Sequence, residues 1–195
     1  MRQITSFALA ALLLVPTAAF AHTGAGAGPG FTNGFMHPLG GLDHILAMVT
    51  VGIFAAQLGG RALWLVPATF VLVMAAGGGA GVAGVPVPHV EVGIALSVIV
   101  LGAIVALKAR APVVIAMGIV GFFAVFHGYA HGAEMPSAAS GPLYAIGFMA
   151  TTALLHATGI GIGLLIGQAG GRQGADRIAG LAVTAAGIGL LTGVV

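Results

Sequence analysis

Six apolar stretches dominate this sequence, and each is long enough to cross a lipid bilayer as a helix. A spanning helix needs ~20 mostly apolar residues to cross a hydrocarbon core about 30 Å thick. The stretches are separated by short breaks that contain glycine, proline or charge, which are typical of helix ends. The predicted spans are 35–58, 62–84, 89–107, 112–132, 142–167 and 175–194. The sequence therefore predicts an all-α fold, a polytopic membrane bundle of six transmembrane helices.

The scarcity of charge excludes a soluble domain. Charged residues make up 5% of the 195 residues and hydrophobic ones 59%, whereas a soluble domain carries roughly 25% charged residues. The six Lys and Arg residues form no basic stripe, which excludes nucleic acid as a partner. The sequence has no cysteine, so disulfides and thiolate metal sites are excluded as well. The lipid bilayer is the first expected partner.

The N-terminus has the pattern of a secretory signal peptide. Arg2 precedes a short apolar run, Phe7 to Val15, and Ala19-Phe20-Ala21 is a small-x-small cleavage site. The apolar run is too short to span a bilayer. The expected organisation is a cleaved signal peptide (1–21), a Gly-rich periplasmic segment (22–34) and a six-helix transmembrane domain (35–195).

The basic residues of the mature chain agree with six spans. If the mature N-terminus lies outside, every Lys and Arg falls in an inside loop and none in an outside loop, as the positive-inside rule requires. These residues are Arg61, Lys108, Arg110, Arg172 and Arg177. We therefore expect a bacterial inner-membrane protein whose mature N- and C-termini are both periplasmic.

A first group of ionisable residues lies at the start of the first predicted span. An ionisable group in a bilayer core is costly, so its presence indicates function. If a helix begins at Pro38, His37 lies at its mouth and His44 two turns deeper on the same face. The two glycines between them leave space. Asp43 is rotated off this face, where its carboxylate can accept an imidazole N–H and orient the ring.

A second group lies at the end of the fourth predicted span. His127 and His131 are spaced i, i+4, and Glu134 follows three residues later, so all three share one helix face. Two imidazoles and a carboxylate are a partial ligand shell for a borderline divalent metal. Both groups lie in the outer halves of antiparallel spans. The predicted metal ligands are His37, Asp43, His44, His127, His131 and Glu134.

Four further residues are weaker candidates for the metal route. His22 would be the new N-terminus, where the amine and the imidazole could chelate a metal together. His89 and Glu91 lie at the outer mouth of the third span, and His156 lies deep in the fifth. Each also has an ordinary structural interpretation, because a membrane histidine can simply hydrogen-bond a neighbouring helix.

Two segments resemble the HupE/UreJ family. The sequence HPLGGLDH at 37–44, continued by ILAMVTVG at 45–52, is similar to the family signature, and FHGYAHGAEMP at 126–136 is similar to its second polar motif. The resemblance implies a nickel permease, in some members a cobalt permease, that supplies hydrogenase or urease maturation. It also implies that His37, Asp43 and His44 are required for transport. No enzymatic activity and no prosthetic group are expected, and Ni²⁺ or Co²⁺ is the expected cargo.

The expected mechanism starts with a hydrated ion at the outer face. The ion would lose water to the clustered histidines and leave past His156. Protons compete with metal for neutral imidazole, so binding should weaken below about pH 6.5. The ligand chemistry gives a borderline divalent metal, and nickel follows only from the resemblance.

Several alternatives stay open: a cobalt permease, a metal sensor or chaperone that moves no ion, and a bis-His haem protein. An intramembrane metalloenzyme is less well supported, because Gly128 follows His127 and the HExxH pattern is absent. The oligomeric state is open, a homo-oligomer included.

Overall fold

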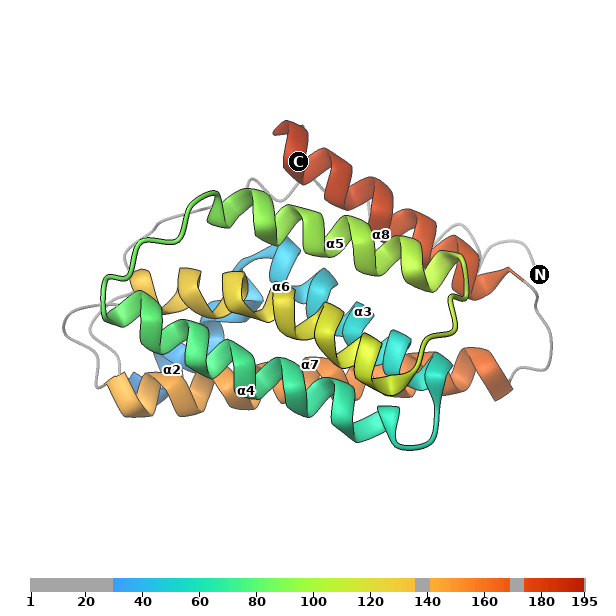
Figure 1. Ribbon diagram of the computed structural model, residues 1–195, viewed down its shortest axis with the longest axis horizontal. Coiled ribbons are helices and arrows are strands. Elements are labelled where there is room, and N and C mark those ends of the chain that lie inside the picture. The colour runs from blue at the N-terminus through green and yellow to red at the C-terminus, as the bar shows by residue number, and fades with distance from the viewer. Residues whose placement is uncertain (1–29, 136–140, 169–173, 195) are drawn as a thin grey trace, which may run out of the picture.

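The computed structural model of this protein describes residues 30–135, 141–168 and 174–194, and this part is all-helical with no strand. The predicted signal peptide, His22 and Arg172 lie outside the described residues. The helices are shown in Figure 1. In chain order they are α2 (Gly30–Met36), the 3-10 helix η1 (His37–Gly40), α3 (Leu42–Leu58), α4 (Ala62–Val82), α5 (Val90–Ala106), α6 (Val113–Ala133), α7 (Gly141–Gln168) and α8 (Ala175–Thr192).

Four helices, α4, α6, α7 and α8, are each long and apolar enough to cross a membrane. Helix α5 is apolar but has 17 residues, which rise about 25 Å along a helix axis. Several apolar helices of this kind are typical of a multi-pass membrane protein. The predicted all-α class is confirmed, and the second to sixth predicted spans each coincide with one helix.

The first predicted span is not one continuous helix, so that part of the prediction is wrong. The segment Gly30–Gly40, which comprises α2 and η1, meets α3 at an angle of 85°. The cause is local: Pro38 lies in the first turn of η1, and Gly41 is extended, with φ −113° and ψ 123°. Helix α3 therefore begins at Leu42 rather than near Pro38. Helix α2 also begins inside the predicted Gly-rich periplasmic segment, at Gly30.

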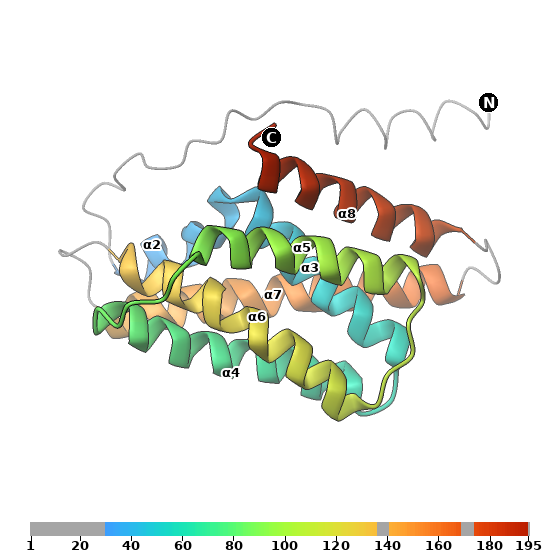
Figure 2. The same ribbon diagram turned by 45° about the horizontal axis from the view of Figure 1, so that its top comes forward.

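The tightest helix pairs are α4 with α6, α5 with α8, α3 with α7 and α2 with α7. Figures 1 and 2 show α8 on the outside of the bundle, beside α5. Thr151 of α7 donates a hydrogen bond of 2.6 Å to the carbonyl oxygen of Phe35, which fastens α2 to α7. The short α2 is thereby held in the bundle although it makes less than half a span.

Glycines set the close contact between α4 and α6. A Cβ added at Gly128 would collide with the carbonyl oxygen of Met74, and one added at Gly132 would collide with that of Gly78. The two backbones therefore touch, as small residues allow in membrane helix pairs. Because both glycines are neighbours of His127 and His131 in the chain, this contact presses the histidine-bearing turns of α6 against α4.

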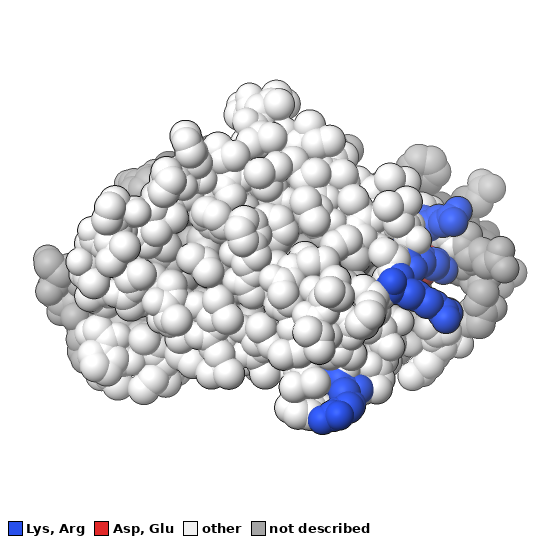
Figure 3. Space-filling view, in the orientation of Figure 1, with Lys and Arg blue, Asp and Glu red and all other residues white. Residues whose placement is uncertain are grey.

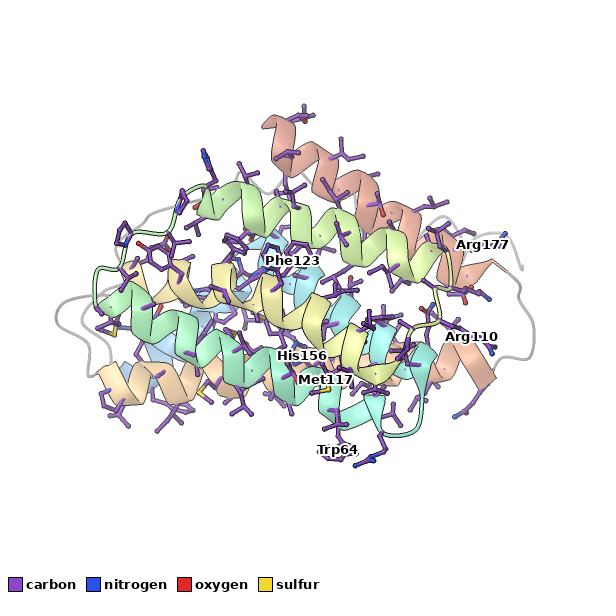
Figure 4. All side chains as sticks on the ribbon, viewed as in Figure 1. Trp64, Arg110, Met117, Phe123, His156 and Arg177 are labelled. Carbon is purple, nitrogen blue, oxygen red and sulfur yellow. The ribbon has the colours of Figure 1, made fainter. Side chains whose placement is uncertain are left out.

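The described basic residues gather at one end of the bundle. They are Arg61, Lys108, Arg110 and Arg177, which lie near the connections α3–α4, α5–α6 and α7–α8. Figure 3 shows Lys and Arg at this end, and Figure 4 labels two of these residues there. The Nζ atom of Lys108 lies 2.6 Å from Oδ2 of Asp176, which links the α5–α6 connection to α8. The helix ends that flank these connections lie at one end of the bundle, as the charge pattern predicted.

Candidate functional site: a histidine cluster

Four imidazole rings from η1, α3 and α6 lie in contact, and we call them the histidine cluster: His37, His44, His127 and His131. The ring centroids of His37 and His131 are 4.6 Å apart, and those of His131 and His44 are 4.3 Å apart. His44 then contacts His127 at 4.9 Å. The structure therefore brings the two sequence motifs together, with His131 between the two histidines of the first motif.

The two motifs reach the cluster by different backbone geometry. His127 and His131 are one turn apart on a continuous helix, as their spacing predicted, and they are 0% and 3% exposed. His37 instead lies in η1, and His44 in the first turn of α3, beyond the bend. The expected arrangement of His37 and His44 two turns apart on one straight helix is absent. The bend places both rings against His131 instead.

Asp43 orients His44. Its Oδ1 atom lies 2.7 Å from Nδ1 of His44 and also accepts the backbone N–H of His44 at 2.8 Å. An ionised carboxylate only accepts hydrogen bonds, so Nδ1 is the protonated nitrogen. Nε2 of His44 then carries the free lone pair, and it is buried without a hydrogen-bond partner. A carboxylate in this position is the usual support of a metal-binding histidine.

Ser97 of α5 orients His127 in a similar way. Its hydroxyl donates to the carbonyl oxygen of Ile94 at 2.6 Å and lies 2.8 Å from Nε2 of His127. Because the single hydroxyl proton goes to Ile94, Nε2 of His127 must donate to the hydroxyl oxygen. Nδ1 of His127 is left as the lone-pair nitrogen, and it too is buried without a partner. Ser97 was not among the residues predicted from the sequence.

Unpartnered nitrogens are the main chemical feature of this region. Within the described residues, six imidazole nitrogens are buried without a hydrogen-bond partner: Nε2 of His44, Nδ1 of His127 and both nitrogens of His131 and His156. A buried polar group without a partner costs about 1–3 kcal/mol. Such groups in native proteins call for an explanation, such as an ion or an ordered water. Imidazole nitrogens with a free lone pair are ligands that favour a soft-to-borderline metal cation.

His37 and Glu134 form the more exposed edge of the cluster. Nε2 of His37 lies 3.5 Å from Oε2 of Glu134, and their side chains are 31% and 40% exposed. Tyr144 of α7, which the sequence analysis missed, contacts the ring of His37 at a centroid distance of 5.8 Å. The predicted carboxylate of the second motif thus lies beside the first histidine of the first motif.

None of the weaker candidates within the described residues has a ring in contact with the cluster. Glu91 and Asp43 line one hollow of about 140 Å³ between α3, α5 and α8. His89 precedes α5 in a left-handed conformation, with φ 55°, and makes no ring contact within the described chain. His156 is 1% exposed, and among the residues that the structure describes its ring contacts that of Phe70 alone. Figure 4 shows His156 in the middle of the bundle, away from the end where Arg110 and Arg177 lie.

The histidine cluster is not a closed metal cage. Among the described residues, no group of three His, Asp or Glu side chains has metal-holding geometry. The neighbouring rings meet edge to face, at interplanar angles of 61° to 88°. Rotation of the side chains is needed before two lone pairs can point at one ion. The rings are thus neighbouring ligands that can share one ion only after their side chains rotate.

Comparison with known proteins gives two matches. The profile of the family described as HupE / UreJ protein matches residues 10–190. Protein HupE from Rhizobium leguminosarum bv. viciae is 49% identical over 184 residues, which cover 94% of this chain and 95% of that protein. No solved structure matches the chain. Both polar motifs lie inside the matched range.

Proposed function

The chain belongs to the HupE/UreJ family, whose members are transporters and accessory proteins rather than enzymes, and on this basis we propose that it carries Ni²⁺ into the cell for hydrogenase or urease maturation. The observation that supports transport most directly is the histidine cluster. Two motifs far apart in the sequence meet there, and four of their imidazole nitrogens, on His44, His127 and His131, are buried without a hydrogen-bond partner. A purely structural role would require ordered water at these nitrogens, since each would otherwise stay unsatisfied at a cost of about 1–3 kcal/mol.

The proposed ion is a borderline divalent metal. The available metal donors are Nε2 of His44, Nδ1 of His127 and one nitrogen of His131, with carboxylates only at the edge. Imidazole suits nickel, cobalt, zinc and copper, whereas magnesium and calcium prefer oxygen ligands. Nickel is chosen from the family membership, and cobalt is the second candidate. The ion is cargo in this proposal, and no prosthetic group is required.

The proposed topology has six spans. Helices α2 and α3, with η1 between them, together make the first span, and the other five are α4 to α8. Broken helices lie at the binding sites of many transporters, because irregular backbone is tolerated where it lines a cavity or site. The end with Arg61 and Lys108 would face the cytoplasm under the positive-inside rule. His37 and Glu134 would then face the periplasm and receive the ion first.

The test is uptake of radioactive nickel by cells that express the protein. We expect His44→Ala and His131→Ala to abolish uptake, and excess cobalt, but not magnesium, to compete. His89→Ala is the matched control, because His89 lies outside the cluster, and it should keep most of the uptake. Protein in the membrane is measured for every variant.

No uptake above control cells, with the wild-type protein present in the membrane, would contradict transport. Nickel binding by the purified protein would then favour the sensor or chaperone alternative. An absorption band in the visible range would favour the haem alternative.

A further inference from the structure

We propose that Phe70 of α4 is the gate of the metal route, closing the passage between the histidine cluster and His156. This inference rests on the proposed function, since a gate has meaning only if an ion passes. Phe70 is 0% exposed and belongs to the apolar core. Its ring contacts one imidazole of the cluster, that of His127, and also the ring of His156.

The ring of Phe70 lies in contact with both the histidine cluster and His156. Its ring centroid is 5.6 Å from that of His127 and 5.1 Å from that of His156. Within the described chain, His127 and His156 make no ring contact with each other. The contacts therefore form one series of rings, from His37 through His131, His44 and His127 to Phe70 and then His156.

The supply of metal-binding nitrogens is interrupted at the Phe70 ring. Nδ1 of His127 is an unpartnered buried nitrogen on one side, and both nitrogens of His156 are unpartnered on the other. Phe70 offers no lone pair. A divalent ion held by imidazoles on either side would lose ligands next to the ring, and a cation–π contact of roughly 0.5–2 kcal/mol replaces little of that loss. Apolar constrictions also exclude water, and channels use them as gates for this reason.

The backbone of α4 holds the ring at this position. Phe70 lies on the buried stripe of α4, one turn from Val66 and one turn from Met74. The carbonyl oxygen of Met74 is in turn pressed against Gly128 of α6. Helix α4 is thus fixed against the turn of α6 that carries His127. The Phe70 ring can therefore move aside only if its own side chain rotates or if the two helices separate.

A gate and a packing residue respond differently to substitution, and this difference is the test. Phe70→Leu opens the constriction, and Phe70→Trp narrows it. For a gate we expect the maximal nickel uptake rate per molecule of membrane protein to rise several-fold in Phe70→Leu and to fall several-fold in Phe70→Trp. Nickel affinity of the purified protein should change little in both, because no imidazole of the cluster is replaced.

The matched control is Phe54→Leu, which replaces another buried core phenylalanine, 1% exposed, that contacts none of the histidine rings. A packing role predicts that Phe70→Leu and Phe70→Trp both lower uptake, or change it no more than the control does, and this result would overturn the gate. Phe70→Met replaces Phe70→Leu if the latter does not reach the membrane. Absence of uptake in the wild type would refute the proposed function instead, so the two failures are distinguishable.

Discussion

The two polar motifs contribute equally to the histidine cluster but depend on different physics. The second motif uses an uninterrupted helix, where a spacing of four residues aligns His127 with His131. The first motif uses an interruption, where an extended Gly41 and an 85° bend bring His37 and His44 to the same ring. One motif is thus held by helix packing and the other by local backbone and hydrogen bonds. Substitutions should separate these two kinds of support.

The largest effect is expected where the second motif packs. Gly128→Ala would place a Cβ against the carbonyl oxygen of Met74, which is backbone and cannot rotate away. We expect α4 and α6 to be forced apart, with a loss of stability of about 1–3 kcal/mol and loss of uptake. Thermal unfolding in detergent measures the first effect.

Gly118→Ala is the control on the same helix, because an added Cβ there meets nothing within 4 Å. It should leave the unfolding temperature unchanged or raise it slightly, since alanine favours helix. Equal unfolding temperatures for the Gly118 and Gly128 variants would show that the second motif does not depend on close packing.

The next effect is expected in the first motif, at Asp43. Asp43→Asn replaces the carboxylate that accepts the Nδ1 proton of His44, so the ring is less strongly held in the tautomer that leaves Nε2 free. We expect nickel affinity to fall roughly 10–100-fold, the usual range for such supporting groups, with little change in unfolding temperature. Calorimetric titration of the purified protein measures the affinity. An unchanged affinity would mean that Asp43 does not orient a ligand.

A smaller effect on binding is expected at Gly41. A Cβ added there would lie 2.5 Å from Oδ1 of Asp43 and 2.9 Å from Nδ1 of His44, so Gly41→Ala must displace this pair. Because side chains can shift where backbone cannot, we expect a drop in affinity of up to about tenfold. Gly40→Ala is the neighbouring control, since its Cβ meets nothing within 4 Å. The prediction fails if the two variants bind nickel equally well.

The smallest effect is expected at Ser97. Ser97→Ala removes the acceptor of the Nε2 proton of His127 and leaves the ring free to change tautomer. The hydrogen bond is worth about 0.5–1.5 kcal/mol, so nickel affinity should fall several-fold at most. A loss as large as that of Asp43→Asn would show that the two motifs are supported equally by hydrogen bonds.

The comparison also explains what the sequence could and could not predict. Helical periodicity was sufficient for His127 and His131, because their helix is regular. Pro38 and the two glycines before Asp43 were visible as helix breakers, but the direction of the bend depends on how α2 packs against α7. Ser97 and Phe70 are ordinary residues in apolar helices, and nothing in their local pattern distinguishes them. Their roles arise from contacts between helices, which periodicity does not determine.

The most direct test of the central claim is X-ray absorption spectroscopy of the nickel-loaded purified protein, beside His44→Ala and His131→Ala. The account predicts scattering from imidazole ligands in the wild type. It also predicts a loss of imidazole signal in each variant, because both motifs supply nitrogen to one ion. A nickel shell of oxygen ligands alone, or a spectrum unchanged by either substitution, would contradict the claim that the two motifs form one metal-binding site.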